Sequence, residues 1–190
     1  LASSAASDVY KRQAMTVPVI YSAAKANPQH TFTVLTQAFL IPVFMNRPAN
    51  VDVIGINTKA AEKTLGGLLR FASALVKYEY DVVLDLHNVI RTIIICTFFR
   101  LNGKRVFVLD KARKERKRLT AIKGKRLYPL RPVIVRYADV FRAAGLNYTE
   151  TFTSLYEESP AELSGMASVA GIKKGKWIGV APFAKHRGKI

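Results

Sequence analysis

The sequence predicts an α/β domain built on a Rossmann-like parallel sheet, and three observations lead to this fold class. Segments rich in β-branched residues alternate with segments of helical periodicity, at a spacing typical of parallel strands joined by crossover helices. One strand segment, residues 82–86, is almost entirely apolar, as expected for a strand covered on both faces. Hydrophobic residues make up 49% of the 190-residue chain and charged residues 23%, a balance typical of globular domains.

Strands and helices are predicted in alternating order. Residues 31–36, 51–56, 82–86 and 105–109 have the composition of strands. Helices are predicted at 14–26, 59–78, 89–101 and 132–144, and a short helix at 37–45 is interrupted at Pro42. The helix at 59–78 carries an apolar stripe of Leu65, Leu68, Leu69, Ala72, Leu75 and Val76. Right-handed crossovers between these strands predict one doubly wound sheet with residues 82–86 at its centre.

The chain is predicted to hold one whole domain and the start of another. Residues 1–13 fit neither period and are interpreted as a non-native scar, with a native disordered tail as the alternative. The Rossmann-like domain is predicted at 14–145, and residues 146–175 are predicted to form an interdomain connector. Residues 176–190 begin a new strand and a basic loop, interpreted as the start of a truncated second domain.

Charge and cysteine content limit the function classes. The formal net charge of +17 favours an anionic partner such as nucleic acid, an acidic membrane surface or a phosphorylated substrate. The single cysteine, Cys96, excludes an internal disulfide and a cysteine-based zinc site. It lies in the apolar run 93–99, which is shorter than the ~20 residues that span a bilayer, so we expect a buried core thiol. No secretory signal is apparent, and a cytosolic protein is expected.

Polar residues follow the predicted strand 82–86, where open α/β sheets bind their ligands. Asp85, His87, Asn88 and Arg91 are therefore candidate binding residues. The Arg91 guanidinium can form a bidentate pair with a phosphate or a carboxylate. The alternatives are local, because Asp85 and Asn88 can cap the next helix and Arg91 can pair with an acidic neighbour.

A dense basic stretch spans residues 111–126, with nine cationic side chains and one glutamate. A solvated face or a mobile loop is the structural alternative, but we favour binding of an acidic acceptor and a membrane surface, at ~1 kcal/mol for each engaged cation. The residues assigned to this role are Arg113, Lys114, Arg116, Lys117 and Arg118. The rival function is a non-enzymatic, basic nucleic-acid-binding α/β domain. It is weakened because residues 111–126 contain no aromatic side chain for base stacking.

Three motifs in register carry a family resemblance. They are Ala14-Met-Thr-Val-Pro-Val-Ile20, Asp85-Leu-His-Asn-Val-Ile-Arg91 and Ala181-Pro-Phe-Ala-Lys-His-Arg-Gly-Lys189. Together with the βα pattern between them, they resemble the ADP-heptose:lipopolysaccharide heptosyltransferases of glycosyltransferase family 9, over residues 14–190. The resemblance implies a GT-B architecture of two facing Rossmann-like domains. This chain would be its N-terminal half, truncated at the start of the second domain.

The resemblance also implies an activity, a location and partners. Family members transfer a heptose from ADP-heptose to the inner core of lipopolysaccharide, with inversion, without a metal and without a further cofactor. The acceptor would be the lipid A–core, held by the residues assigned above, and no nucleic acid would be bound. Lys189, and less closely Lys185, match a lysine that contacts the donor diphosphate. Such an enzyme is cytoplasmic and touches the anionic inner face of the inner membrane in a Gram-negative bacterium.

One departure from the family concerns catalysis. The family's proposed general base is an aspartate in the loop after the first strand, and the matching position here is Arg12. A guanidinium stays protonated and cannot accept the proton of the acceptor hydroxyl. The sequence therefore predicts no catalytic residue, and the chain is expected to be inactive.

Overall fold

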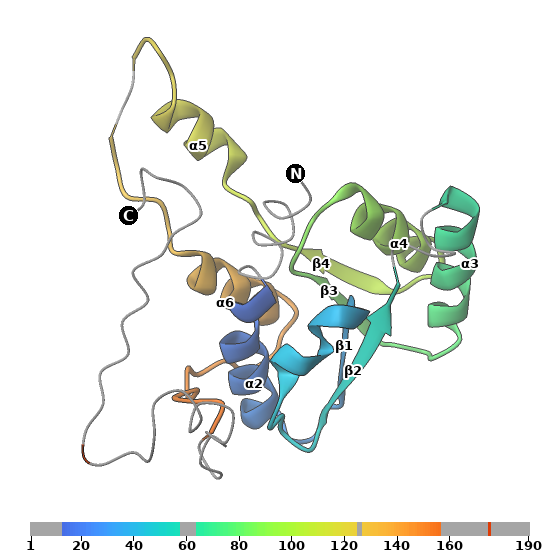
Figure 1. The fold of residues 1–190 in the computed structure, drawn as a ribbon. Helices are drawn as coiled ribbons and strands as arrows, with labels where there is room; N and C mark the ends of the chain where they lie inside the picture. The colour runs from blue at the N-terminus through green and yellow to red at the C-terminus, as the bar shows by residue number, and fades with distance from the viewer. Residues whose placement is uncertain (1–12, 58–63, 125–126, 157–174, 176–190) are drawn as a thin grey trace. The chain divides into compact units, whose positions relative to one another are not determined.

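The computed structural model describes residues 13–57, 64–124, 127–156 and 175 (Figure 1). The chain divides into two compact units, Leu1–Leu155 and Tyr156–Ile190. All of the described helices and strands belong to the first unit.

These elements make a mixed α/β fold, as predicted. In chain order they are α2 (Val17–Ala26), β1 (Phe32–Gln37), the 3-10 helix η1 (Ala38–Phe44), β2 (Val51–Ile56), α3 (Leu65–Val76), β3 (Val82–Asp85), α4 (Ile90–Leu101), β4 (Arg105–Val108), α5 (Arg113–Leu119) and α6 (Val133–Ala143). The predicted strands are confirmed within one residue at each end. The basic helix α5 was not predicted, because its sequence is almost entirely charged and has no apolar period.

The strands pair in parallel, but they form two sheets instead of one. β1 pairs with β2 from Phe32 opposite Val51 to Gln37 opposite Ile56, and β3 pairs with β4 from Val82 opposite Arg105 to Asp85 opposite Val108. The prediction of a single sheet with β3 at its centre is therefore wrong for the described residues. β3 has a partner on one side only, because no described strand lies between it and β1.

Helices cover both faces of these strand pairs (Figure 1). A first apolar core joins α2 and α6 to one face of all four strands, and it includes Phe32, Val53, Leu84 and Phe107. A second core joins α3 and α4 to the other face of β1, β3 and β4, and it includes Leu35, Val83 and Val106. This three-layer arrangement follows from the period of two along each strand, which sends successive side chains to opposite faces.

The segment after α6 also packs on the first core. Leu146, Tyr148, Phe152 and Leu155 are partly buried against it. The backbone N–H groups of Thr151 and Phe152 donate hydrogen bonds to the Ser22 hydroxyl at 3.1 and 3.2 Å. The compact part of the chain thus extends ten residues beyond Gly145, where the sequence places the start of the connector.

None of the described helices is long and apolar enough to cross a lipid bilayer. The longest of them, α3 and α4, have 12 residues each.

Gly55 in β2 lies where η1 leaves no room for a side chain. A Cβ at Gly55 would lie 2.8 Å from Ile41 Cδ1 and 2.9 Å from Ala38 Cα. We expect Gly55→Ala to lower the free energy of unfolding by about 1–3 kcal/mol, because the backbone of η1 must shift. Gly66→Ala is the matched control, because Gly66 lies in the first turn of α3 and a Cβ there would meet open space. We expect this variant to raise the free energy of unfolding by up to about 1 kcal/mol. Urea denaturation measures the free energy of unfolding of both variants. Equal values for Gly55→Ala and Gly66→Ala would contradict the close packing of η1 on β2.

Candidate functional site at the carboxyl edge of β3 and β4

The carboxyl ends of β3 and β4 bring two loops together. Asp85 and Val108 are opposite each other in the ladder, so the loops leave the sheet at the same level. The N–H of Leu109 donates to the carbonyl of Asp85 at 2.8 Å, and the Asn88 side-chain amide donates to the carbonyl of Leu109 at 2.9 Å. These bonds fix the segment that contains His87 against the start of the segment that leads to α5.

Asp85 and Asn88 have local roles in this loop. Asp85 is 5% exposed, and its Oδ1 accepts hydrogen bonds from the N–H groups of His87 at 2.8 Å and Asn88 at 2.7 Å. Asn88 takes a left-handed backbone conformation, with φ of 48°, that the turn requires. The structure therefore shows these two predicted binding residues holding the loop, whereas the N-cap of α4 is Val89 and neither of the two caps that helix.

Cys96 lies beneath this loop on α4 and is buried, as predicted. The pKa of its thiol is raised from 9.0 to about 12, mainly by burial. The Asp85 carboxylate contributes to this rise, whereas the charge of Arg100 opposes it. The thiol is therefore protonated and unreactive at neutral pH.

Cys96 provides a readout of the intact core. Because its pKa is higher in the folded state, its contribution to stability is complete below pH 9.0 and is lost as pH rises toward about 12. At pH near 8, we expect iodoacetamide to alkylate the native thiol more than ~100-fold more slowly than the unfolded one, since less thiolate forms and access is blocked. Mass spectrometry of the labelled protein measures both rates. Similar rates would show that Cys96 is not buried in the native protein.

His87 and Arg91 remain the outward-facing members of the predicted set. His87 is half-buried and Arg91 is exposed. Arg91 lies in the first turn of α4, whose start is fixed by Thr92, since the Thr92 hydroxyl accepts from the N–H of Val89 at 2.9 Å. Among the described residues, Arg91 has no carboxylate in ion-pair distance. Its guanidinium can therefore meet an anion at the sheet edge.

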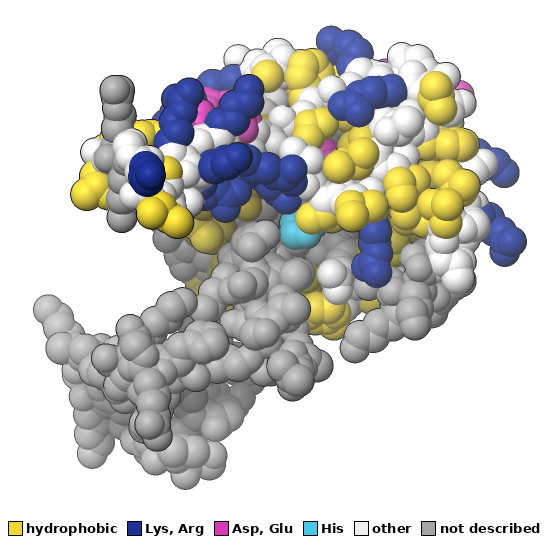
Figure 2. All heavy atoms as spheres, turned by 90° about the horizontal axis from the view of Figure 1, so that it is seen from above, with side chains coloured by type: hydrophobic (Ala, Val, Ile, Leu, Met, Phe, Trp, Pro, Cys, Tyr) yellow, Lys and Arg dark blue, Asp and Glu magenta, His cyan; other side chains and the backbone are white. Residues whose placement is uncertain are grey.

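The cations of α5 form a basic surface, shown in dark blue in Figure 2. Arg113, Lys114, Arg116, Lys117 and Arg118 are all exposed. The chain enters the helix through Ala112, which has φ of 49°, and Arg116 donates to the carbonyl of Lys111 at 2.8 Å. No carboxylate of the described residues forms an ion pair with these five side chains. Residues 113–119 of the predicted basic run thus form a helix that carries five exposed cations without an ion-pair partner among the described residues.

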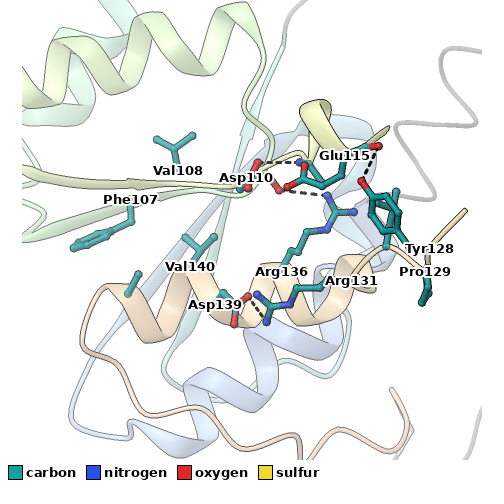
Figure 3. Close-up of a pocket in the computed structure, with 13 residues that line it drawn as sticks. Phe107, Val108, Asp110, Glu115, Tyr128, Pro129, Arg131, Arg136, Asp139 and Val140 are labelled. Carbon is teal, nitrogen blue, oxygen red and sulfur yellow. Dashed lines mark hydrogen bonds and ion pairs between the residues drawn. The ribbon is translucent and has the colours of Figure 1, made fainter. Parts of the chain in front are cut away.

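A pocket opens between β4, α5, the segment 128–131 and α6 (Figure 3). Its volume is about 470 Å³, within the range typical of small-molecule sites. Its apolar lining includes Val108, Leu130 and Val140, and its polar lining includes Asp110, Glu115, Tyr128, Arg131 and Arg136.

Two arginines in this pocket differ in how far they are neutralised. Arg131 lies 2.8 Å from a carboxylate oxygen of Asp139, which also pairs with Arg142 at 3.2 Å. Arg136 donates to the backbone carbonyl of Asp110 at 3.3 Å, and its buried Nε has no partner among the described residues. A buried guanidinium N–H without an acceptor is costly. An anionic ligand group in the pocket would supply the missing acceptor.

The sequence did not identify Tyr128, Arg131 or Arg136 as site residues. The available signal was the spacing of Arg136, Asp139 and Arg142, which places charged residues three apart on one face of an otherwise apolar helix. That spacing indicates an exposed charged face as readily as a pocket. Arg12, Lys185 and Lys189, which the resemblance places at the base and donor positions, lie outside the described residues.

No cluster of three or more potential metal ligands occurs within the described ranges. Comparisons of the chain with protein families, curated proteins and solved structures found no match.

Proposed function

We propose that this chain is the acceptor-side domain of a GT-B glycosyltransferase that transfers a heptose from ADP-heptose to the inner core of lipopolysaccharide. The observation that carries the proposal is the arrangement at one sheet edge of the Arg136 pocket, the exposed Arg91 and the cationic helix α5. The motif resemblance supplies the reaction class, and the Rossmann-like architecture is consistent with the three-layer, parallel-stranded fold.

The pocket chemistry suits an acidic sugar. The carboxylates of Asp110 and Glu115 can accept hydrogen bonds from sugar hydroxyls, and the Tyr128 ring offers an apolar face. Arg136 can pair with a phosphate or a carboxylate of the same ligand. A hydroxyl oxygen of a neutral sugar could also accept from the Arg136 Nε–H, but only an anionic group would in addition pair with the guanidinium charge, so the proposed ligand is anionic.

The cationic helix suits a membrane-associated acceptor. An anionic leaflet attracts a nearby Lys or Arg by ~1 kcal/mol each. In this proposal α5 holds the protein in peripheral contact with the inner face of the inner membrane. The lipid-linked acceptor is then delivered to the adjoining pocket.

In the proposed reaction the acceptor hydroxyl loses its proton to a carboxylate base as its oxygen bonds to the anomeric carbon, and ADP departs from the opposite face with its bonding electrons. Arg12 at the base position cannot take that proton. The function proposed for the chain as given is therefore binding and orientation of the acceptor, without transfer.

Vesicle binding tests this assignment. The full chain is titrated, across a salt series, with neutral phosphatidylcholine vesicles that carry lipid A–core glycolipid. The matched vesicles carry phosphatidylglycerol at the same surface charge. We expect tighter binding to the glycolipid vesicles at every salt concentration, because the pocket adds to the surface attraction. Equal binding to the two kinds of vesicle would mean that the site is only a general cationic surface and does not recognise the glycolipid. Tighter binding to single- or double-stranded nucleic acid would favour the rival function.

A further inference from the structure

Helix α5 and the turn that follows it project from the strand layers as an arm, residues 113–124 and 127 (Figure 1). None of the seven residues of α5 is buried. The arm is fixed at its base, because the Tyr128 hydroxyl donates to the carbonyl of Glu115 at 3.2 Å. The chain therefore leaves the domain along α5 and returns to the first turn of the same helix.

The tip of the arm exposes two large aliphatic side chains. Ile122 is fully exposed (101%) and Leu127 is 82% exposed, the two highest values for a large apolar side chain within the described residues. Gly124 lies between them with φ of 67°, a left-handed conformation that suits a tight change of direction. Single exposed apolar side chains are common on protein surfaces, but two of them at the end of a projecting arm indicate a contact with an apolar partner.

Cations surround this apolar tip. From Lys111 to Lys123 the sequence has seven lysines and arginines and one acidic residue, Glu115. Arg118 and Lys123 are the cations nearest in sequence to Ile122, and both are exposed. The partner of the arm must therefore offer an anionic surface as well as an apolar one.

A lipid bilayer with an anionic surface offers both kinds of contact. Its headgroup region is about 5–8 Å thick on each side, whereas the seven residues of α5 span about 10 Å. Cations in the last turn of α5 can stay among the lipid phosphates while Ile122, three residues farther on, reaches the acyl chains. The long side chain of Lys123 can extend back to the headgroups. A nucleic-acid duplex presents phosphates to such an arm but no continuous aliphatic layer.

We propose that Ile122 and Leu127 insert among the acyl chains of an anionic bilayer while the cations of the arm bind its headgroups. This inference rests on the membrane contact in the proposed function and assigns it to two further residues. The cations supply an attraction that salt screens, and the tip supplies apolar burial that salt does not screen. Glu115 and Tyr128 at the base of the arm also line the Arg136 pocket, so insertion of the tip holds that pocket near the membrane surface.

Vesicle titration of the full chain tests the role of the tip. The vesicles contain phosphatidylcholine and phosphatidylglycerol, without glycolipid. We expect Ile122→Ser and Leu127→Ser each to weaken binding roughly tenfold, because the aliphatic burial is lost. Leu101→Ser is the matched control, since Leu101 ends α4 and is 80% exposed, and it should bind as the unmodified chain does. The ratio between Leu127→Ser and the unmodified chain should persist as salt is raised.

Fluorescence quenching tests insertion directly. Trp177 is the only tryptophan of the chain, so the variant Trp177→Phe gives a dark background. In that background, we expect the emission of Ile122→Trp to shift to the blue and to be quenched by lipids brominated along their acyl chains. The emission of Leu101→Trp, in the same background, should not be quenched.

Several results would overturn the proposal. These are absence of binding to the anionic vesicles, an equal loss of binding in Leu101→Ser, and no quenching of Ile122→Trp in the bound protein. Tighter binding to duplex DNA that Leu127→Ser weakens would assign the tip to nucleic acid instead. The glycolipid comparison under the proposed function is a separate readout, because a lost preference for glycolipid would contradict acceptor binding and leave tip insertion in place.

Discussion

Replacement of the five α5 cations by glutamine is expected to weaken binding to anionic vesicles by roughly 100-fold or more. The substituted residues are Arg113, Lys114, Arg116, Lys117 and Arg118. Each engaged cation contributes ~1 kcal/mol near an anionic surface, and about half of the side chains around a short helix can face the membrane at once. No buried contact is lost, because all five side chains are exposed. Vesicle co-sedimentation at fixed lipid charge and low salt measures the change.

The control must separate the position of the charge from its amount. A second variant replaces five cations elsewhere, namely Arg70, Lys77, Arg100, Lys104 and Arg105. Both variants lower the formal net charge from +17 to +12. If vesicle binding fell equally in both, the net charge alone would account for it, and α5 would not be a specific membrane contact.

Asn27→Ala is expected to have the largest effect of any single substitution on stability, a loss of about 3–5 kcal/mol. Asn27 is 1% exposed at the end of α2. Its amide donates to the carbonyls of Ala23 at 2.7 Å and Asn147 at 2.8 Å, and its Oδ1 accepts from the N–H of Asn147 at 3.1 Å. Truncation removes all three of these hydrogen bonds, and each group that is left buried without a partner costs about 1–3 kcal/mol. Such a loss is a large part of the 5–15 kcal/mol typical of a domain.

Asn102→Ala is the matched control. Asn102 ends α4 as Asn27 ends α2, and its amide donates to the carbonyl four residues earlier, Phe98, at 2.8 Å. It is exposed and makes no bond to a distant segment of the described chain, so a change within about 0.5 kcal/mol is expected. Chemical denaturation of the Asn27→Ala and Asn102→Ala variants gives their free energies of unfolding. A small effect at Asn27 would mean that residues after α6 are not tied to α2.

The local elements could be read from the sequence because their signals are local. Strands β1 and β2 follow from β-branched alternation, and α3 follows from its apolar stripe. The start of α2 was placed three residues too early, since Pro18 fixes the true first turn near Val17. The pairing of strands was not predictable in the same way. A βα pattern predicts parallel neighbours, but it does not say whether β1 and β3 meet or leave a place between them.

The sequence pointed to only part of the candidate site, because only that part depends on local sequence signals. Its position at the end of β3 follows from a general rule for α/β sheets, and His87 and Arg91 lie there. The division of roles within that loop depends on backbone geometry, which directs Asp85 to the N–H groups of the turn. The Arg136 pocket depends on the meeting of β4, α5 and α6, and this tertiary arrangement leaves no pattern in any one of their sequences.

The most direct test of the central claim is an NMR titration of the ¹⁵N-labelled chain with delipidated, phosphorylated core oligosaccharide. The claim is that an acidic sugar binds at the carboxyl edge of β3 and β4. We expect saturable shift changes at His87, Arg91 and Arg136, and in the segment 113–118. Changes confined to the opposite edge, near Lys77 and Lys104, or no changes at all, would contradict it.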